Sequence, residues 1–544
     1  MMSSSIRRLG VLLVLAMLVQ SFVVEVRSFD VHRLTIDYDL LVVLVGMDIN
    51  VSELRSSIDV DEIEASYGSY TIVFRFNVTI VEMPRNYVEK LRVWLAEHYM
   101  DLGKPWWVLE YEEERNVTLV VRWVPLIEFY NYLYQLVERY DREHGLDPED
   151  HIVFLGDLDG VSRQYVARVR HPEGFGEIVL EGVRGWGGCK PMTFYDLTTI
   201  PRPRPEPYQP FAGLGTPTNF VTDPPIWDLK DVESYVARIV RNHLRFHVVN
   251  AFIGMDIWFA RSIELQLYFV DFGNRSKVEE LIHRLNVSYL IDLLHSYAPW
   301  INYVIEIRIL NASELPRLAE LARKNVVGGW IAFPYPAVAK VFDRYVSQVL
   351  DLEPPRGFIE RWRYAVFVLV TTLPSYLTIH GFFNFTGFST PIYAVITYPG
   401  YRYRIARSSL VKGIAHEVGH ALGLQHPFQA LDPSGRTSIE WLMDWVASVM
   451  SYEDSSLAGF GYPPRDYYSM YRLAIVHTLA ILSYVEETSS LPTLVEEVLK
   501  LMSRGKCFDA LNLALSYLES MKKPVVGIPL HLVETIAIRV PLPR

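Results

Sequence analysis

The chain has 544 residues, of which 50% are hydrophobic and 13% aromatic, and it carries a formal net charge of −11. A chain this long and this apolar can bury more than one core, so it is not intrinsically disordered and several domains are expected. Its acidic balance argues against nucleic acid as a partner, because no long basic stripe is present to replace the counterions of phosphate.

The first 28 residues have the pattern of an export signal. Arg7 and Arg8 precede an apolar run at residues 9–24, and small residues before Phe29 fit a cleavage site. The apolar run gives about 24 Å of helix, short of the roughly 30 Å of a hydrocarbon core, so cleavage is favoured over an uncleaved anchor. No later stretch predicts a membrane span. We therefore expect a secreted or cell-surface protein.

After this signal, residues 29–200 are expected to form an α+β domain, which could be a prosegment or an accessory module. Residues 40–46 and 70–81 are β-rich, whereas residues 86–100 and 126–142 have helical spacing. This mixture of strands and helices indicates the α+β class.

A proline-rich break follows the first domain. Eight prolines fall between Pro201 and Pro225, where neither a helix nor a central strand can persist. We expect residues 201–227 to be an extended interdomain linker, with an ordered loop over a neighbouring domain as the alternative.

Beyond the break, residues 228–330 are expected to form a second α+β unit. Residues 248–257 resemble residues 42–49, and Val-Glu-Glu-Leu at 278–281 corresponds to Val-Glu-Lys-Leu at 88–91. These matches suggest a duplicated unit. The spacing between them drifts, however, so coincidence is an equal alternative.

The next segment combines strands with a central helix. Residues 336–352 have helical periodicity, residues 364–373 form a buried β run, and residues 391–398 predict a second strand. Between these strands, residues 380–384 could form an edge strand. A helix is then expected at residues 407–424.

This last helix carries the sequence HEVGHALGLQH. His416 and His420 are four residues apart, so both imidazoles lie on one helix face, close enough to bind one metal ion. Gly423 can take the left-handed conformation that ends a helix, which lets the chain return with His426 as a third ligand. Glu417 is then placed to take a proton from a water bound to the metal.

A second motif, Ser448-Val449-Met450-Ser451-Tyr452, lies downstream. Together the two motifs resemble the metzincin zinc peptidases, in which HExxHxxGxxH is followed by a methionine turn beneath the metal. The resemblance implies a peptidase domain at residues 331–490, built on a twisted mixed sheet and an active-site helix. It also implies that Met450 floors the site and that Tyr452 is a mobile ligand or oxyanion donor. Plain core packing of Met450 and a structural hydrogen bond of Tyr452 stay open.

The resemblance covers residues 364–487 and is specific only in its two motifs. Matrixins, serralysins and astacins share parts of the pattern, but Pro427 and Phe428 replace the acidic residue expected in astacins. The matrixin cysteine switch is absent as such, and so are the calcium-binding nonapeptide repeats of serralysins. We therefore expect one catalytic Zn²⁺, find no indication of calcium, and leave the subfamily unassigned.

The chain has two cysteines, Cys189 and Cys507. In an exported protein they could form one disulfide that ties the middle of the chain to its C-terminal helices. Alternatively, the Cys189 thiolate could occupy the metal as a latency switch.

Seven asparagines begin Asn-x-Ser/Thr sequons, a large share of the asparagines in this chain. Each could carry a glycan in an exported protein, although short sequons also arise by chance. None follows residue 384, which leaves the histidine motif clear. The seven are Asn50, Asn77, Asn116, Asn274, Asn286, Asn311 and Asn384.

The C-terminal part is expected to be helical. Residues 466–487 predict the last helix of the peptidase domain, and residues 491–544 predict a helical hairpin, turning at residues 503–505, and a tail. The hairpin has no place in the metzincin pattern, so it is expected to be an appended packing or interaction unit.

The leading hypothesis is a secreted zinc endopeptidase that acts on protein or peptide substrates, with Glu417 as general base. The rival is a cell-surface glycoprotein that keeps a metzincin-like domain for structure or adhesion, as the sequons and the large non-catalytic portion suggest. Glu417 argues against this rival, because a structural zinc site needs no base and usually has a fourth protein ligand. The natural substrate and the oligomeric state do not follow from the sequence.

Overall fold

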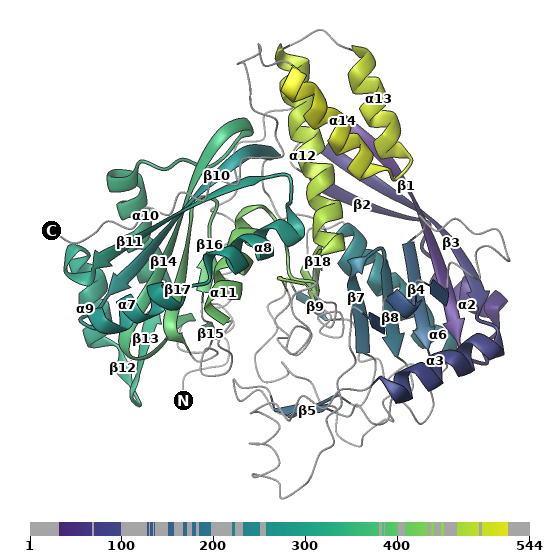
Figure 1. Cartoon of the computed structure of the whole chain (residues 1–544), viewed down its shortest axis with the longest axis horizontal. Helices are drawn as coiled ribbons and strands as arrows, with labels where there is room; N and C mark the ends of the chain where they lie inside the picture. The colour runs from purple at the N-terminus through teal and green to yellow at the C-terminus, as the bar shows by residue number, and fades with distance from the viewer. Residues whose placement is uncertain are drawn as a thin grey trace, which may run out of the picture. The chain divides into compact units, whose positions relative to one another are not determined.

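In the computed structural model, the described residues form a mixed α+β fold built around two large mixed sheets (Figure 1). By their contacts, the residues divide into two compact units that alternate along the chain. The β1 unit comprises residues 1–255, 425–472 and 499–506, and the β14 unit comprises residues 256–424, 473–498 and 507–544. The structure describes residues 32–67, 70–98, 128–129, 131–133, 135–136, 151–156, 167–170, 177–180, 184–196, 220–222, 232–250, 257–379, 383–385, 387–400, 409–431, 437–439, 448–450, 465–488 and 492–520.

The β1 unit is built on a six-stranded sheet with the order β2-β3-β1-β4-β8-β7. The four central strands run parallel, and the edge strands β2 and β7 run antiparallel to their neighbours. Residues 40–45 of β1 are all buried, because both faces of this central strand are covered. The strands are β1 (His32–Val45), β2 (Glu62–Tyr67), β3 (Tyr70–Glu82), β4 (His151–Gly156), β7 (Arg184–Lys190) and β8 (Met192–Asp196).

Helices cover the sheet of the β1 unit. α3 (Arg85–Glu97) packs Leu91 and Leu95 onto Leu41 and Val43 of β1 in one hydrophobic core. α2 (Val51–Ile58) begins directly after β1. Its packing partner α6 (Val232–Asn242) lies almost two hundred residues further along the chain.

The helix α6 continues without a break into η3 (His243–Val249), a π-helical segment that ends at Asn250. The segment at residues 248–257, which resembles residues 42–49, therefore begins in a helix. Its supposed counterpart at residues 42–45 is a strand, so the two segments are not structurally equivalent there. Local β propensity in His243–Val249 is overridden by the packing of η3, whose side chains are almost all buried.

Two small sheets complete the description of the β1 unit. β18 (Gln429–Leu431) pairs with β19 (Thr437–Ile439), which pairs in parallel with β9 (Phe220–Thr222). β9 is the only described part of the predicted proline-rich linker. β5 (Ala167–Arg170) and β6 (Glu177–Leu180) form a separate antiparallel pair.

The β14 unit is built on an eight-stranded mixed sheet around the long central strand β14 (Gly357–Ile379). The first half of β14 pairs in parallel with β10 and β17, and its second half pairs with β13. This arrangement confirms the strands predicted at residues 364–373 and 391–398. The other strands are β10 (Trp258–Asp271), β11 (Asn302–Asn311), β12 (Val326–Val327), β13 (Trp330–Pro334), β15 (Phe383–Phe385), β16 (Gly387–Ser389) and β17 (Tyr393–Gly400).

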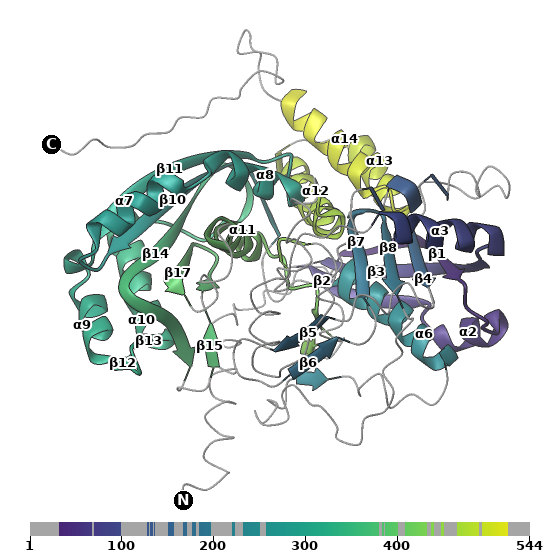
Figure 2. The ribbon, with the colours of Figure 1, turned by 60° about the horizontal axis from the view of Figure 1, so that its bottom comes forward.

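One face of this sheet is covered by α9 (Pro316–Lys324) and α10 (Tyr335–Tyr345), whose Leu318 and Phe342 join Phe367 of β14 in a common core. α11 (Ser409–Ala421) lies on the concave side of the curled sheet, as Figure 2 shows. The remaining helices before α11 are α7 (Arg275–Arg284), α8 (Val287–Tyr297) and the short segments η4 (Ala312–Glu314) and η5 (Val346–Leu350).

Three helices follow the described end of the histidine segment: α12 (Tyr467–Thr488), α13 (Pro492–Ser503) and α14 (Cys507–Ser520). The last two helices, joined by a turn, lie where the hairpin is predicted. Gly505 has a φ of 75°, and the N–H groups of Gly505 and Lys506 return to the carbonyls of Met502 and Leu501. Among the helices of the described residues, none combines the length and the apolar character that crossing a membrane requires.

Candidate metal centre

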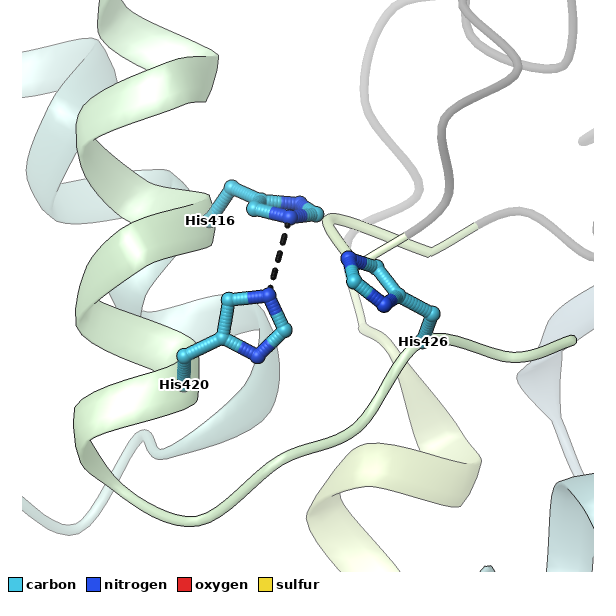
Figure 3. Close-up of side chains that lie close together, drawn as sticks. All are labelled: His416, His420 and His426. Carbon is cyan, nitrogen blue, oxygen red and sulfur yellow. Dashed lines mark hydrogen bonds between the residues drawn. The ribbon is translucent and has the colours of Figure 1, made fainter. Parts of the chain in front are cut away.

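The helix α11 supplies the first two histidines of the centre. Their four-residue spacing places the Nε2 atoms of His416 and His420 only 3.1 Å apart. Two nitrogens bound at about 2.0 Å to a tetrahedral zinc ion would lie about 3.3 Å from each other. Figure 3 shows both rings projecting from one side of the helix toward His426.

A glycine turn ends α11 and brings the chain back. Gly423 has a φ of 95°, which a residue without Cβ adopts readily. Its N–H donates to the carbonyl of His420 at 2.9 Å, and that of Leu424 donates to the carbonyl of Gly419 at 2.9 Å. This pair of bonds is the Schellman arrangement, and it confirms the turn predicted at Gly423.

The three histidines form a compact donor group. One ligand nitrogen from each of His416, His420 and His426 lies within 4.8 Å of the other two. His416 and His426 are buried, and His420 is partly exposed. Burial lowers the pKa of His420 to about 4, so its imidazole is neutral near pH 7, as a metal ligand must be. Within the described residues, this group could hold a metal ion.

Hydrogen bonds orient two of the rings. His420 Nδ1 lies 2.8 Å from the carbonyl oxygen of Leu424, and His426 Nδ1 lies 2.6 Å from Oε1 of Gln429. An oxygen of this kind only accepts, so Nδ1 carries the proton in both rings and Nε2 keeps its lone pair. Such partners fix the tautomer and the direction of metal-binding histidines.

Glu417 is buried beside the two helical histidines, at 8% exposure. Its Oε2 has no hydrogen-bond partner among the described residues. Burial raises the pKa of the carboxyl to about 8, because the charged form loses its hydration. A dication nearby would favour the ionised form by direct attraction. Among the described residues the carboxylate is therefore poorly satisfied, and it suits a site that contains a cation.

The other oxygen of Glu417 lies against β16. A Cβ built on Gly387 would stand 2.6 Å from Oε1 of Glu417 and 3.1 Å from the carbonyl oxygen of Val395, so only glycine leaves the carboxylate its place. Of the edge strand expected at residues 380–384, residues 380–382 lie outside the described residues. Residues 383–385 form β15, which pairs with β14, and both β16 and its antiparallel partner β17 contact α11.

The returning segment is fixed by contacts that the motif does not reveal. The backbone carbonyl of His426 accepts hydrogen bonds from Nδ2 of Asn250 and from the N–H of Gln429, each at 3.0 Å. The ring of His426 stacks on Phe428, with a centroid separation of 4.8 Å and an interplanar angle of 10°. Sequence reasoning missed Asn250, Gln429 and Gly387, and none of them stands in a recognisable motif.

The methionine segment is described only at residues 448–450. Met450 is fully buried, and its N–H donates to Oγ of Ser448, which donates to Oδ2 of Asp466 at 2.5 Å. Asp466 also accepts from the N–H of Ser469 at the start of α12. The position of Met450 beneath a metal stays a prediction. Tyr452 lies outside the described residues.

The remaining predicted sites are placed in part. Cys507 is buried at the start of α14, and Cys189 lies in β7, where the description covers the backbone alone. The disulfide and the latency switch therefore stay predictions.

Several sequons have a structural explanation. The side chains of Asn50, Asn286 and Asn311 accept hydrogen bonds from backbone N–H groups at the starts of α2, α8 and η4. Asparagine is favoured at such N-caps, which enriches it there without any glycan. All three are exposed, as is Asn77 on β3, so glycosylation of them stays a prediction. Asn274 precedes α7 and is partly exposed, Asn384 lies in β15, and Asn116 lies outside the described residues.

No protein-family model matches the chain, and no curated protein matches it significantly. The described residues contain a group of three histidines that could hold a metal ion, and the first of them is followed in the sequence by the buried Glu417.

Proposed function

We propose that this protein is a secreted zinc-dependent endopeptidase of the metzincin type. The observation that carries the proposal is the convergence of three imidazole nitrogens beside Glu417, whose buried Oε2 has no partner among the described residues. A purely structural metal site has no use for such a carboxylate.

The donor set fits zinc. Imidazole nitrogens are common zinc ligands, and a site with three protein ligands leaves a position for water or substrate. The orientation of His420 and His426 by Leu424 and Gln429 leaves Nε2 of each ring unprotonated. Zinc bound there would acidify a water molecule and polarise the carbonyl of the scissile peptide bond.

Proton transfer is assigned to residues of the chain. Glu417 accepts the proton of the attacking water at its carboxylate and delivers it to the departing amine. Because this carboxylate is buried, the proton is passed within the site rather than lost to bulk solvent. Gly387 leaves room for Oε1 of this carboxylate, since a Cβ at this position would stand 2.6 Å from it.

The strand β16 is the proposed docking edge for the substrate. Among the described strands it pairs with β17 alone, and it contacts α11. An extended peptide added to this edge would form backbone hydrogen bonds whatever its side chains are. This mode suits an endopeptidase, since it recognises a length of chain.

The proposal is tested with Glu417→Ala and His420→Ala in the full chain. The first variant should keep about one zinc per chain and lose at least 100-fold in cleavage of casein or a mixed peptide library, since general-base catalysis contributes about 10²–10⁴-fold. The second should lose bound zinc together with activity. Zinc content, chelator sensitivity and cleavage rate are the measurements.

Two outcomes would contradict the proposal. Undiminished turnover by Glu417→Ala would reject the assignment of the base. Zinc binding by the unaltered protein without cleavage of any library peptide, after removal of any prosegment, would favour the rival surface glycoprotein.

A further inference from the structure

We propose that Asn250 is a positioning residue of the metal centre, which holds the backbone of His426. This inference rests on the proposed zinc site and deepens it.

The direct link is one hydrogen bond between residues 176 positions apart. Nδ2 of Asn250 donates to the backbone carbonyl of His426 at 3.0 Å, and Asn250 is only 1% exposed. In a dry environment a lost donor leaves the carbonyl partly unsatisfied, at a cost well above that of an exposed bond. The ring of the third histidine is thereby held from its backbone as well as through Gln429.

The backbone conformation at residue 250 suits asparagine. Asn250 ends the π-helical segment η3 with a φ of 25°, a conformation that few side chains tolerate and asparagine accepts. Its N–H is bound to the carbonyl of Arg245 at 2.9 Å. π-Helical turns are uncommon and often occur at functional sites.

Independent contacts anchor η3 and the returning segment within the same unit. Arg472 of α12 donates to the carbonyl of His247, and the hydroxyl of Tyr67 donates to the carbonyl of Val249 at 2.9 Å. β9, another N-terminal segment, pairs with β19, which pairs with β18, where Gln429 lies. The third histidine is therefore supported by N-terminal residues along two routes.

The test compares Asn250→Asp and Asn250→Gly with Asn325→Asp in the full chain. The aspartate removes the donor at equal volume, and glycine removes the amide without backbone strain at positive φ. Asn325 is the matched control, because its Nδ2 also donates to a backbone carbonyl, that of Leu321, at 2.8 Å. Zinc affinity is measured by chelator competition, and the Co²⁺ absorption spectrum reports the ligand geometry.

Both Asn250 variants should bind zinc about 10–100-fold more weakly and shift the Co²⁺ spectrum, whereas Asn325→Asp should match the unaltered protein. Unchanged affinity in a folded Asn250→Gly protein would overturn the proposal, as would an equal loss in Asn325→Asp. A mature zinc-binding protein that begins beyond residue 250 would also overturn it. If the unaltered chain binds no zinc, the proposed site itself fails, and this inference falls with it.

Discussion

The helical half and the returning half of the histidine motif are fixed in different ways. In the helical half, His416 and His420 approach each other because they are one helical turn apart. In the returning half, His426 depends on a glycine turn, on Gln429 and on Asn250. The first arrangement is local, whereas the second needs residues from a distant part of the chain.

A sequence motif therefore identifies the three histidines, but it does not identify the distant residues that hold the third one in place. A helical pair of histidines can form wherever the helix forms, but the third ligand adds affinity only where its backbone is held still. The largest effect expected in the helical half concerns Glu417, the proposed general base, and not its two histidines. Gly387 of β16 lies against the carboxylate of Glu417, so a larger residue at that position would displace it.

Gly387→Ala should disable the base without removing the metal. The new methyl group would overlap Oε1 of Glu417 and push the carboxylate from its place. A displacement of about 1 Å in a catalytic group can cost on the order of 100-fold in rate. We expect that loss in peptide cleavage, with zinc affinity within about threefold of the unaltered protein.

The control is the same change in a Glu417→Ala background. There the methyl group meets no carboxylate, so Gly387→Ala should cause no further loss of cleavage. A further large loss in the double variant would show that Gly387 acts through the sheet instead, for example through its contact with the carbonyl of Val395.

Much of the local structure could be predicted from the sequence. The i, i+4 histidines, the turn at Gly423 and the buried run of β14 follow from helical spacing, left-handed glycine and continuous apolar character. The helical hairpin followed from the turn at Gly505 in the same way. These features depend on neighbours in the sequence.

The features that were missed depend on long-range contacts. Residues 248–249 look like a strand, yet they end a π-helix, because their side chains are buried by packing that propensity does not report. Asn250 and Gly387 matter through single contacts with residues that no periodicity connects to them.

One buried histidine of the β14 unit lies outside the motif and has no proposed role as a ligand. His477 of α12 is fully buried, and its Nδ1 accepts the indole N–H of Trp300 at 2.8 Å. Burial lowers its pKa to about 3, against about 6.5 in an unfolded chain. The unfolded state thus binds the extra proton between these values, so the free energy of unfolding falls as the pH falls below about 6.5.

Replacing His477 by asparagine should remove this pH dependence, because the amide keeps an acceptor for Trp300 but does not titrate. Between pH 8 and pH 5 the unaltered protein should lose about 2 kcal/mol more of its unfolding free energy than His477→Asn. Urea denaturation with a chelator present measures the difference without a contribution from metal. Parallel stability profiles for the two proteins would show that His477 is already neutral in the unfolded state or charged in the folded one.

The smallest expected effect concerns Gln429, which acts on the ring of His426 rather than on its backbone. Gln429→Ala removes the acceptor of the Nδ1 proton, so the ring can rotate and the other tautomer becomes accessible. We expect zinc affinity to fall about 10-fold, the lower end of the range for such partners. Gln429→Glu keeps an acceptor of the same reach and should restore most of the affinity. Equal weakening in both variants would mean that Gln429 serves β18 rather than the ring of His426.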